Sequence, residues 1–187
     1  MNLLVNLLVR VLALAHLNKE IDMHESSFTA IEDFRDRYLK VNDNLKIVDL
    51  FGLSRGDKPC GHLFQEDSWE YKAVSVKKDG WDKKLKADVV ISGQTVERSE
   101  RFWDLMEKVG KIINDGGYLC MIVASSGAYG HDGDHYRFNP DSMSILAGMA
   151  GMDIIECIPD RSTTWWNVVL IAKKPEYEAT PEVIEGE

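Results

Sequence analysis

The chain contains few cysteines. Cys60, Cys120 and Cys157 are spread over its 187 residues, which is too few and too scattered for a disulfide framework. A protein without disulfides fits a reducing compartment, so we expect a cytoplasmic location. Cys120 and Cys157 fall within apolar runs that predict strands, and we expect both to be packed thiols.

Basic residues are also in short supply. The chain has 31 acidic and 22 basic residues, which gives a formal net charge of −9. Binding to nucleic acid requires clustered lysine and arginine to neutralise phosphates, so we expect no nucleic-acid partner. The hydrophobic content of 44% is ordinary for a soluble protein, and the length suffices for one domain with a core.

An apolar segment, residues 1–17, opens the chain. Asn2, Asn6 and Arg10 interrupt it, it is short for a membrane span, and no small-residue cleavage site follows. We therefore expect no integral membrane span. Three interpretations stay open: a helix packed on the domain or on a second subunit, a membrane-surface helix, or a targeting segment. The first predicts a homo-oligomer formed through residues 1–17.

Residues 84–124 predict a strand, a helix and a second strand in sequence. The first strand covers residues 88–92 and the second covers residues 118–124, and both are apolar on both faces. A turn is expected at residues 114–117, where two glycines precede the second strand. Strands of this kind lie at the centre of a parallel sheet with helices on both sides. The helix between them shows an apolar face at spacings of three and four, made by Phe102, Leu105, Met106, Val109, Ile112 and Ile113.

The remaining pattern extends this unit into a larger α/β fold. Further helices are predicted at 24–40 and 139–149, and further strands at 46–51, 71–76, 154–158 and 165–172. Thr29 and Glu32 fit a capping box for the first helix, with Ser26 or Ser27 as alternative caps. We predict an α/β fold with a parallel sheet that is covered by helices on both sides. The domain division is an N-terminal helical segment (1–44), the sheet domain (45–174) and an acidic tail (175–187).

A long polar loop, residues 125–138, follows the second buried strand. Loops at the carboxyl ends of parallel strands are where open α/β sheets bind ligands. His131 and His135 are candidate proton acceptors, because imidazole titrates near neutral pH. Together with Asp132 and Asp134 they could bind a metal, but no distant ligand cluster accompanies them, so we assign no metal. Arg137 is expected to pair with a carboxylate and pin this loop.

Three pieces of sequence, in this order, carry a family resemblance. They are Asp88-Val-Val-Ile-Ser-Gly-Gln94 with Glu97, then Asn114-Asp-Gly-Gly117 before a strand, then Asp134-His-Tyr-Arg-Phe138 before Pro140. Over residues 24–174 the chain resembles class I S-adenosylmethionine-dependent methyltransferases. It is most similar to the small bacterial type often found beside glycosyltransferases. The resemblance implies a Rossmann-like, doubly wound, mostly parallel sheet of seven strands with an antiparallel last strand. It also implies that the cofactor lies across the carboxyl ends of the first strands.

The resemblance also implies roles for individual residues. Ser75 stands where the family has an acidic residue for the ribose hydroxyls, and Arg98 stands where it has a histidine. Glu97 matches the family, although a first-turn acid by itself favours a solvated helix start. The implied cofactor-binding residues are Asp49, Gly52, Gly56, Ser75, Ser92, Gly93 and Gln94, and the implied substrate-binding residues are Asp134, Tyr136 and Arg137.

The expected function is methyl transfer from S-adenosylmethionine to a small polar acceptor such as a sugar. His131 or His135 would accept the proton of the acceptor. Ser75 and the irregular loop after the first strand keep a second hypothesis open, a non-catalytic binding or assembly protein with the same fold. The histidines and aspartates of the long loop keep a third open, a metal-dependent hydrolase.

Overall fold

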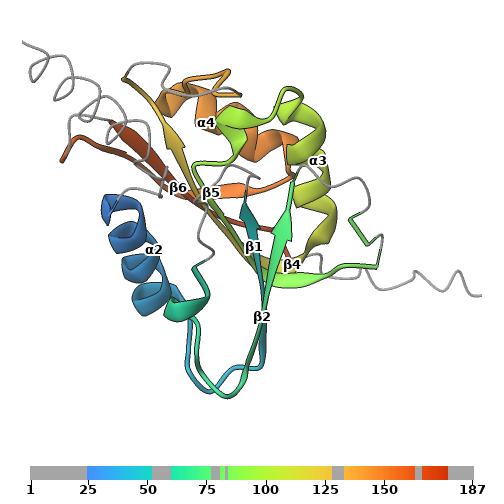
Figure 1. The fold of residues 1–187 in the computed structure, drawn as a ribbon. Helices are drawn as coiled ribbons and strands as arrows, with labels where there is room; N and C mark the ends of the chain where they lie inside the picture. Colours follow the sequence, from blue (N-terminus) through green and yellow to red (C-terminus); the bar gives the residue numbers. More distant parts are fainter. Residues whose placement is uncertain are drawn as a thin grey trace, which may run out of the picture.

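The computed structural model describes residues 25–51, 60–76, 81–82, 84–127, 133–162 and 166–176. They form one sheet between two helical layers, with α2 on one face and α3 and α4 on the other (Figure 1). The elements are α2 (Glu25–Tyr38), β1 (Leu45–Phe51), η1 (Cys60–Leu63), β2 (Trp69–Ser75), β3 (Ala87–Gly93), η2 (Val96–Arg98), α3 (Phe102–Ile112), β4 (Ile113–Ala124), α4 (Pro140–Met149), β5 (Asp153–Asp160) and β6 (Asn167–Lys173).

The sheet has the strand order β2-β1-β3-β4-β6-β5. The pairs β1–β2, β1–β3 and β3–β4 are parallel, whereas β6 is antiparallel to both of its neighbours. This confirms the predicted Rossmann-like, mostly parallel sheet with an antiparallel last strand. The chain moves from β1 to one side to form β2 and then crosses to the other side to form β3. Open α/β sheets bind their ligands at such a reversal.

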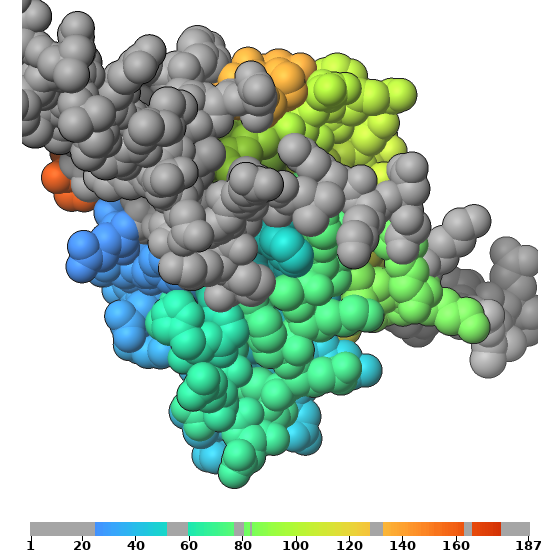
Figure 2. Space-filling view, viewed as in Figure 1, coloured from blue at the N-terminus to red at the C-terminus, as the bar shows by residue number. Residues whose placement is uncertain are grey.

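The sheet has six strands in the described part of the chain, where the resemblance implied seven. Only residues 76–86 lie between β2 and β3. A further parallel strand would need its own crossover of about a dozen residues, and this connection is too short for it. As a result β2 lies at one edge of the sheet that the described residues form. Figure 2 shows β2 and η1 (green) forming a continuous surface beside α2 (blue).

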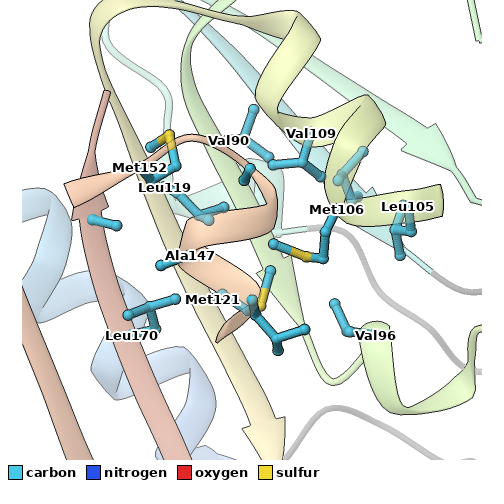
Figure 3. Packing of buried hydrophobic residues seen from close by; sticks show 14 of the residues in the cluster. Val90, Val96, Leu105, Met106, Val109, Leu119, Met121, Ala147, Met152 and Leu170 are labelled. Carbon is cyan, nitrogen blue, oxygen red and sulfur yellow. The ribbon is translucent and has the colours of Figure 1, made fainter. Parts of the chain in front are cut away.

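The prediction that residues 88–92 and 118–124 lie at the centre of the sheet is confirmed. β3 and β4 are neighbours in the middle of the strand order, and their apolar side chains are almost completely buried. One core fills the space between the sheet and α3 and α4, where Val90, Leu119, Met106 and Ala147 lie together (Figure 3). α3 contributes its predicted apolar face, with Leu105, Met106, Val109 and Ile112 all buried.

The predicted turn at residues 114–117 is an irregular part of β4. Ala87 pairs with Ile113 and Val89 already pairs with Tyr118, so the residues between them are displaced from the ladder. Gly116 has φ 76°, a left-handed conformation that glycine adopts without steric cost. The sequence located the glycine conformation correctly but missed that β4 begins directly after α3.

The predicted capping box of the first helix is wrong. Thr29 lies inside α2 (Glu25–Tyr38) and donates its hydroxyl to the Glu25 carbonyl (3.2 Å). The predicted apolar face is present, because Ile31 and Phe34 are fully buried against the sheet. Arg37 also forms a bidentate ion pair with Glu156 (2.7 Å for both bonds), which fastens α2 to β5.

The cysteines and the described helices bear on the expected packed thiols and on the expected lack of a membrane span. All three cysteines are free, with Cys120 buried in β4 and Cys157 half-buried in β5. Within the described residues, none of the helices combines the length and apolar content needed to cross a bilayer. Residues 1–17 lie outside the described part of the chain.

Candidate functional site

The buried polar residues of the molecule gather at one edge of the sheet. Ser27 in α2 is the exception among the buried polar side chains of the described residues. The others lie near the carboxyl ends of the parallel strands or at the start of antiparallel β6, and they are Asp49, Ser75, Ser92, Thr95, Glu97 and Asn167. Burying polar groups costs free energy, so their concentration at the edge where such sheets bind ligands marks the candidate site.

Asp49, the predicted cofactor ligand near the end of β1, is buried and hydrogen-bonded within the protein. One carboxylate oxygen, Oδ2, accepts from the Cys60 amide (2.6 Å) and from the Tyr71 hydroxyl (2.5 Å). Burial raises the pKa of Asp49, and these two hydrogen bonds oppose that shift. Asp49 therefore ties β1 to η1 and to the neighbouring strand β2, which shapes the region around the strand ends.

The ends of β2 and β3 supply the predicted residues Ser75, Ser92, Gly93 and Gln94. The Ser75 and Ser92 hydroxyls are buried and have no hydrogen-bond partner within the described residues. Gln94 has φ 48°, and among the described residues it is the one non-glycine with positive φ. Such a conformation is strained for most residues and is concentrated at functional sites.

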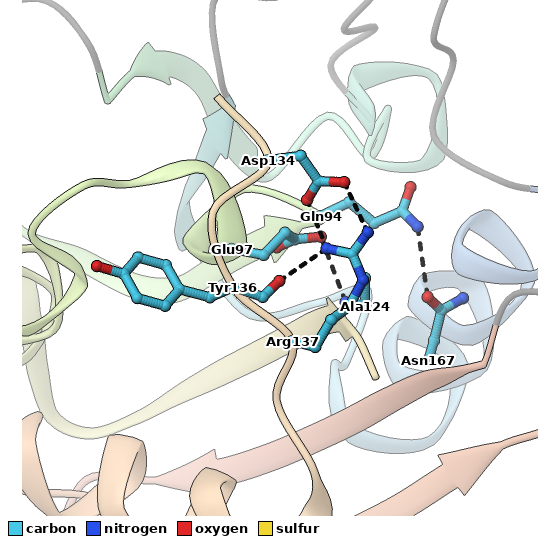
Figure 4. Close-up of polar contacts among 7 residues, drawn as sticks. All are labelled: Gln94, Glu97, Ala124, Asp134, Tyr136, Arg137 and Asn167. Carbon is cyan, nitrogen blue, oxygen red and sulfur yellow. Dashed lines mark hydrogen bonds and ion pairs between the residues drawn. The ribbon is translucent and has the colours of Figure 1, made fainter. Parts of the chain in front are cut away.

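Asn167 belongs to this edge, and the sequence analysis did not single it out. β6 is antiparallel, so its first residue lies where the parallel strands end; Asn167 pairs with Ala124, the last residue of β4. Its Oδ1 accepts from Nε2 of Gln94 (3.3 Å), as Figure 4 shows. The Asn167 amide nitrogen is buried without a partner in the described part of the chain. The signal available in the sequence was an asparagine within the otherwise apolar strand predicted at residues 165–172.

The burial of Glu97 differs from its predicted exposure to solvent. The sequence favours a solvated helix start, but Glu97 is only 2% exposed. Its Oε1 accepts from the Ala124 amide (3.3 Å), while Oε2 is buried with no partner among the described residues. Burial raises the pKa of Glu97 to about 7, and the nearby Asp134 carboxylate contributes in the same direction, whereas Arg98 opposes it.

The loop before α4 packs directly on Glu97, and we call its described residues, 133–138, the post-β4 loop. The Glu97 carbonyl accepts from the amides of His135 (2.9 Å) and Tyr136 (3.1 Å). Arg137 forms a bidentate ion pair with Asp134 (2.6 and 2.7 Å), which confirms the predicted pairing of Arg137 with a carboxylate (Figure 4). The predicted catalytic residue His135 has an exposed side chain.

Some predicted site residues lie outside the described part of the chain. They are Gly52, Gly56 and His131, together with Asp132 of the possible metal cluster. Among the described residues there is no group of three or more His, Cys, Asp or Glu that could hold a metal ion. The described members of that cluster are Asp134, which binds Arg137, and His135.

Comparison with known proteins adds structural evidence. A scan against protein-family models finds no match, and a search of curated proteins finds none either. A 1,6-didemethyltoxoflavin-N1-methyltransferase from Burkholderia thailandensis, solved with bound 1,6-didemethyltoxoflavin and S-adenosylhomocysteine, superposes with a TM-score of 0.55 at 11% identity. The match covers 81% of this chain and 80% of that chain. A Bacillus halodurans structure assigned as a methyltransferase gives 0.58 at 11% identity, covering 78% and 98%.

The strand order and these superpositions agree. The chain has the class I S-adenosylmethionine-dependent methyltransferase fold. The [4+2]-cyclase SpnF superposes on it as well, with a TM-score of 0.55 at 11% identity over 79% of this chain and 80% of that chain. Proteins with the methyltransferase fold thus include one described as a cyclase, so the reaction of this chain has to be argued from its own site.

Proposed function

We propose that this chain is an S-adenosylmethionine-dependent methyltransferase that acts on a small polar acceptor such as a sugar. The observation that carries the proposal is the set of buried polar groups at the carboxyl edge of β1, β2 and β3, where the strand order reverses. The Burkholderia thailandensis methyltransferase of the same fold, solved with S-adenosylhomocysteine, supports this choice of cofactor.

The described residues of this edge fit a ligand rich in hydroxyl and amine groups. The hydroxyls of Ser75 and Ser92 have no hydrogen-bond partner among the described residues, and each can donate and accept a hydrogen bond. Ser75 ends β2 and would serve the ribose hydroxyls in place of the family's acidic residue. We assign cofactor binding to the predicted set, Asp49, Gly52, Gly56, Ser75, Ser92, Gly93 and Gln94.

When bound, S-adenosylmethionine supplies a methyl group on a positively charged sulfur, which an oxygen or nitrogen nucleophile takes up with loss of its proton. The post-β4 loop would hold the acceptor through Asp134, Tyr136 and Arg137. Either of the predicted catalytic histidines, His131 or His135, would accept its proton. Holding the two reactants in line can lower the barrier by roughly 7–11 kcal/mol in the best intramolecular cases.

Calorimetric titration with S-adenosylmethionine and S-adenosylhomocysteine tests the proposal. Micromolar binding, about −8 kcal/mol, is expected for the unaltered chain. Ser75→Ala should weaken it roughly tenfold, because one hydrogen bond to the ligand is worth about 1.4 kcal/mol. Ser144→Ala is the matched control, since Ser144 is exposed on α4, and it should bind as the unaltered chain does.

The same titration decides between the proposal and the non-catalytic alternative. The feature that favours the alternative is Ser75, which offers no charge to the ribose hydroxyls. A folded protein that binds neither ligand at millimolar concentration would refute the methyltransferase proposal and favour a binding or assembly protein.

A further inference from the structure

Glu97 connects three parts of the candidate site. It belongs to η2, the short turn that follows β3. Its side chain accepts from the Ala124 amide at the end of β4, and its carbonyl accepts from two successive amides of the post-β4 loop. The Phe138 amide also donates to the Ala124 carbonyl (3.0 Å). Ala124 is therefore held from both sides, by the Glu97 side chain and by the end of the loop.

These contacts fix the residues that the proposed reaction needs. The post-β4 loop carries His135, Tyr136 and Arg137, and in Figure 4 it runs across Glu97 with the Asp134–Arg137 pair beside it. The Tyr136 hydroxyl donates to the Glu100 carbonyl (2.9 Å), which adds a further attachment of the loop to the segment after β3.

We propose that Glu97 is a positioning residue that holds the post-β4 loop, and with it the acceptor-binding side chains, against the end of β3. The proposal deepens the methyltransferase function and rests on it for the identity of the site. The contacts described above do not depend on a bound ligand, so the positioning role can be tested separately from cofactor binding.

The charge state of Glu97 gives the role a measurable signature. The groups that act on the buried carboxyl are Arg98 of η2, the Ala124 amide of β4 and the Asp134 carboxylate of the post-β4 loop. A closed loop favours the neutral acid, with its pKa raised to about 7. An open loop would return the carboxyl to water and to its ordinary pKa. The loop therefore opens more easily as the pH rises from about 4.5, the ordinary pKa, to about 7, the raised pKa. Above pH 7 the ease of opening does not change further.

Amide hydrogen exchange of the full chain measures this opening. In the unaltered protein, the protection factors of Tyr136 and Phe138 should fall between pH 5 and pH 7, at most about tenfold per pH unit, and then level off. Glu97→Gln keeps an acceptor for the Ala124 amide and cannot ionise, so protection should be retained and its pH dependence lost. Glu97→Met has similar size but no acceptor for the Ala124 amide. Ala124, whose carbonyl receives the Phe138 amide, is then held less firmly, so the protection of Phe138 should fall at least tenfold.

Two results would overturn the positioning role. One is unchanged loop protection in Glu97→Met, and the other is an unchanged pH profile in Glu97→Gln. If the methionine variant fails to fold, the pH profile of the glutamine variant decides alone. Glu107→Gln, on the exposed face of α3, is the matched control and should leave both quantities unchanged. Calorimetry with S-adenosylhomocysteine on the same variants shows separately whether the cofactor site exists.

Discussion

At the scale of single residues, Asp49 shows how a predicted ligand can have a structural role as well. Its carboxylate was expected at the end of the first strand, and it is found there, but one oxygen is occupied by the Cys60 amide and the Tyr71 hydroxyl. Removing Asp49 would leave the buried Cys60 amide and the half-buried Tyr71 hydroxyl without this acceptor.

We therefore expect Asp49→Ala to lower the free energy of unfolding by about 2–4 kcal/mol, because one buried and one half-buried donor lose their acceptor. Tyr71→Phe, which removes one hydroxyl and leaves Asp49 bound to the Cys60 amide, should cost about 1 kcal/mol. Urea unfolding followed by tryptophan fluorescence measures both. Equal stability of the two variants would show that the Asp49 contacts do not contribute as described.

Glu97 gives a prediction about stability and pH. Its pKa in the folded protein is about 7, raised from 4.5 by burial. Between these two values the unfolded chain has released a proton that the folded chain still holds, so stability falls as pH rises. The raised pKa of Glu97 contributes about 3 kcal/mol to the free energy of unfolding below pH 4.5, and this contribution is lost by pH 7.

Glu97→Gln removes this contribution. The stability of the variant relative to the unaltered protein should therefore increase by up to about 3 kcal/mol from pH 4.5 to pH 7 and stay constant above pH 7. Urea unfolding at a series of pH values measures the difference. A difference that does not change with pH would mean that Glu97 ionises normally in the folded protein.

At the scale of elements, α3 and α4 pack through a glycine. A Cβ atom at Gly110 of α3 would lie 2.3 Å from the Ala150 carbonyl oxygen, just after α4. At Gly148 of α4, a Cβ would have no neighbour within 4 Å. The two helical glycines therefore differ in their surroundings, although helix propensity alone would favour alanine at both.

We expect the two alanine substitutions to have opposite effects. Gly110→Ala should destabilise the protein by about 2 kcal/mol or more, because the helices must move apart. Gly148→Ala should be neutral or stabilise it by up to about 1 kcal/mol. Thermal unfolding followed by circular dichroism compares the two variants. Equal effects would contradict the close approach of α3 to the chain after α4.

At the scale of the whole molecule, β5 forms one edge of the described sheet. Three of its isoleucines, Ile154, Ile155 and Ile158, are 40–50% exposed. An edge strand with exposed apolar side chains is a template for pairing or packing with another segment. Residues 1–17, outside the described part of the chain, are the most apolar candidate for that contact.

Deletion of residues 1–17 should therefore change the oligomeric state or the solubility, because an apolar surface loses its covering. Light scattering coupled to size-exclusion chromatography measures the mass. Deletion of the acidic residues 177–187 is the control. It should leave the number of chains per assembly unchanged. An unchanged assembly after the first deletion would reject residues 1–17 as a docking segment.

The sequence by itself determined the central unit of this protein. Strands β3 and β4 and helix α3 were predictable because burial on both faces of a strand, and on one face of a helix, imposes a regular spacing of apolar residues. The start of α4 was predictable for a local reason too, since Asn139 caps the helix and Pro140 takes its first position. The pairing of Arg137 with Asp134 lies within four residues of the chain.

The tertiary structure alone decided that Glu97 and Asn167 belong to the site. Glu97 resembles a solvated helix start in the sequence, and it is buried because a loop more than thirty residues later packs on its carbonyl. Asn167 reaches the same edge only because β6 runs antiparallel to β4. The edge position of β2 follows from the short connection to β3. Hydrophobic periodicity records whether a residue is buried, whereas the partners of a buried polar group depend on contacts between distant segments.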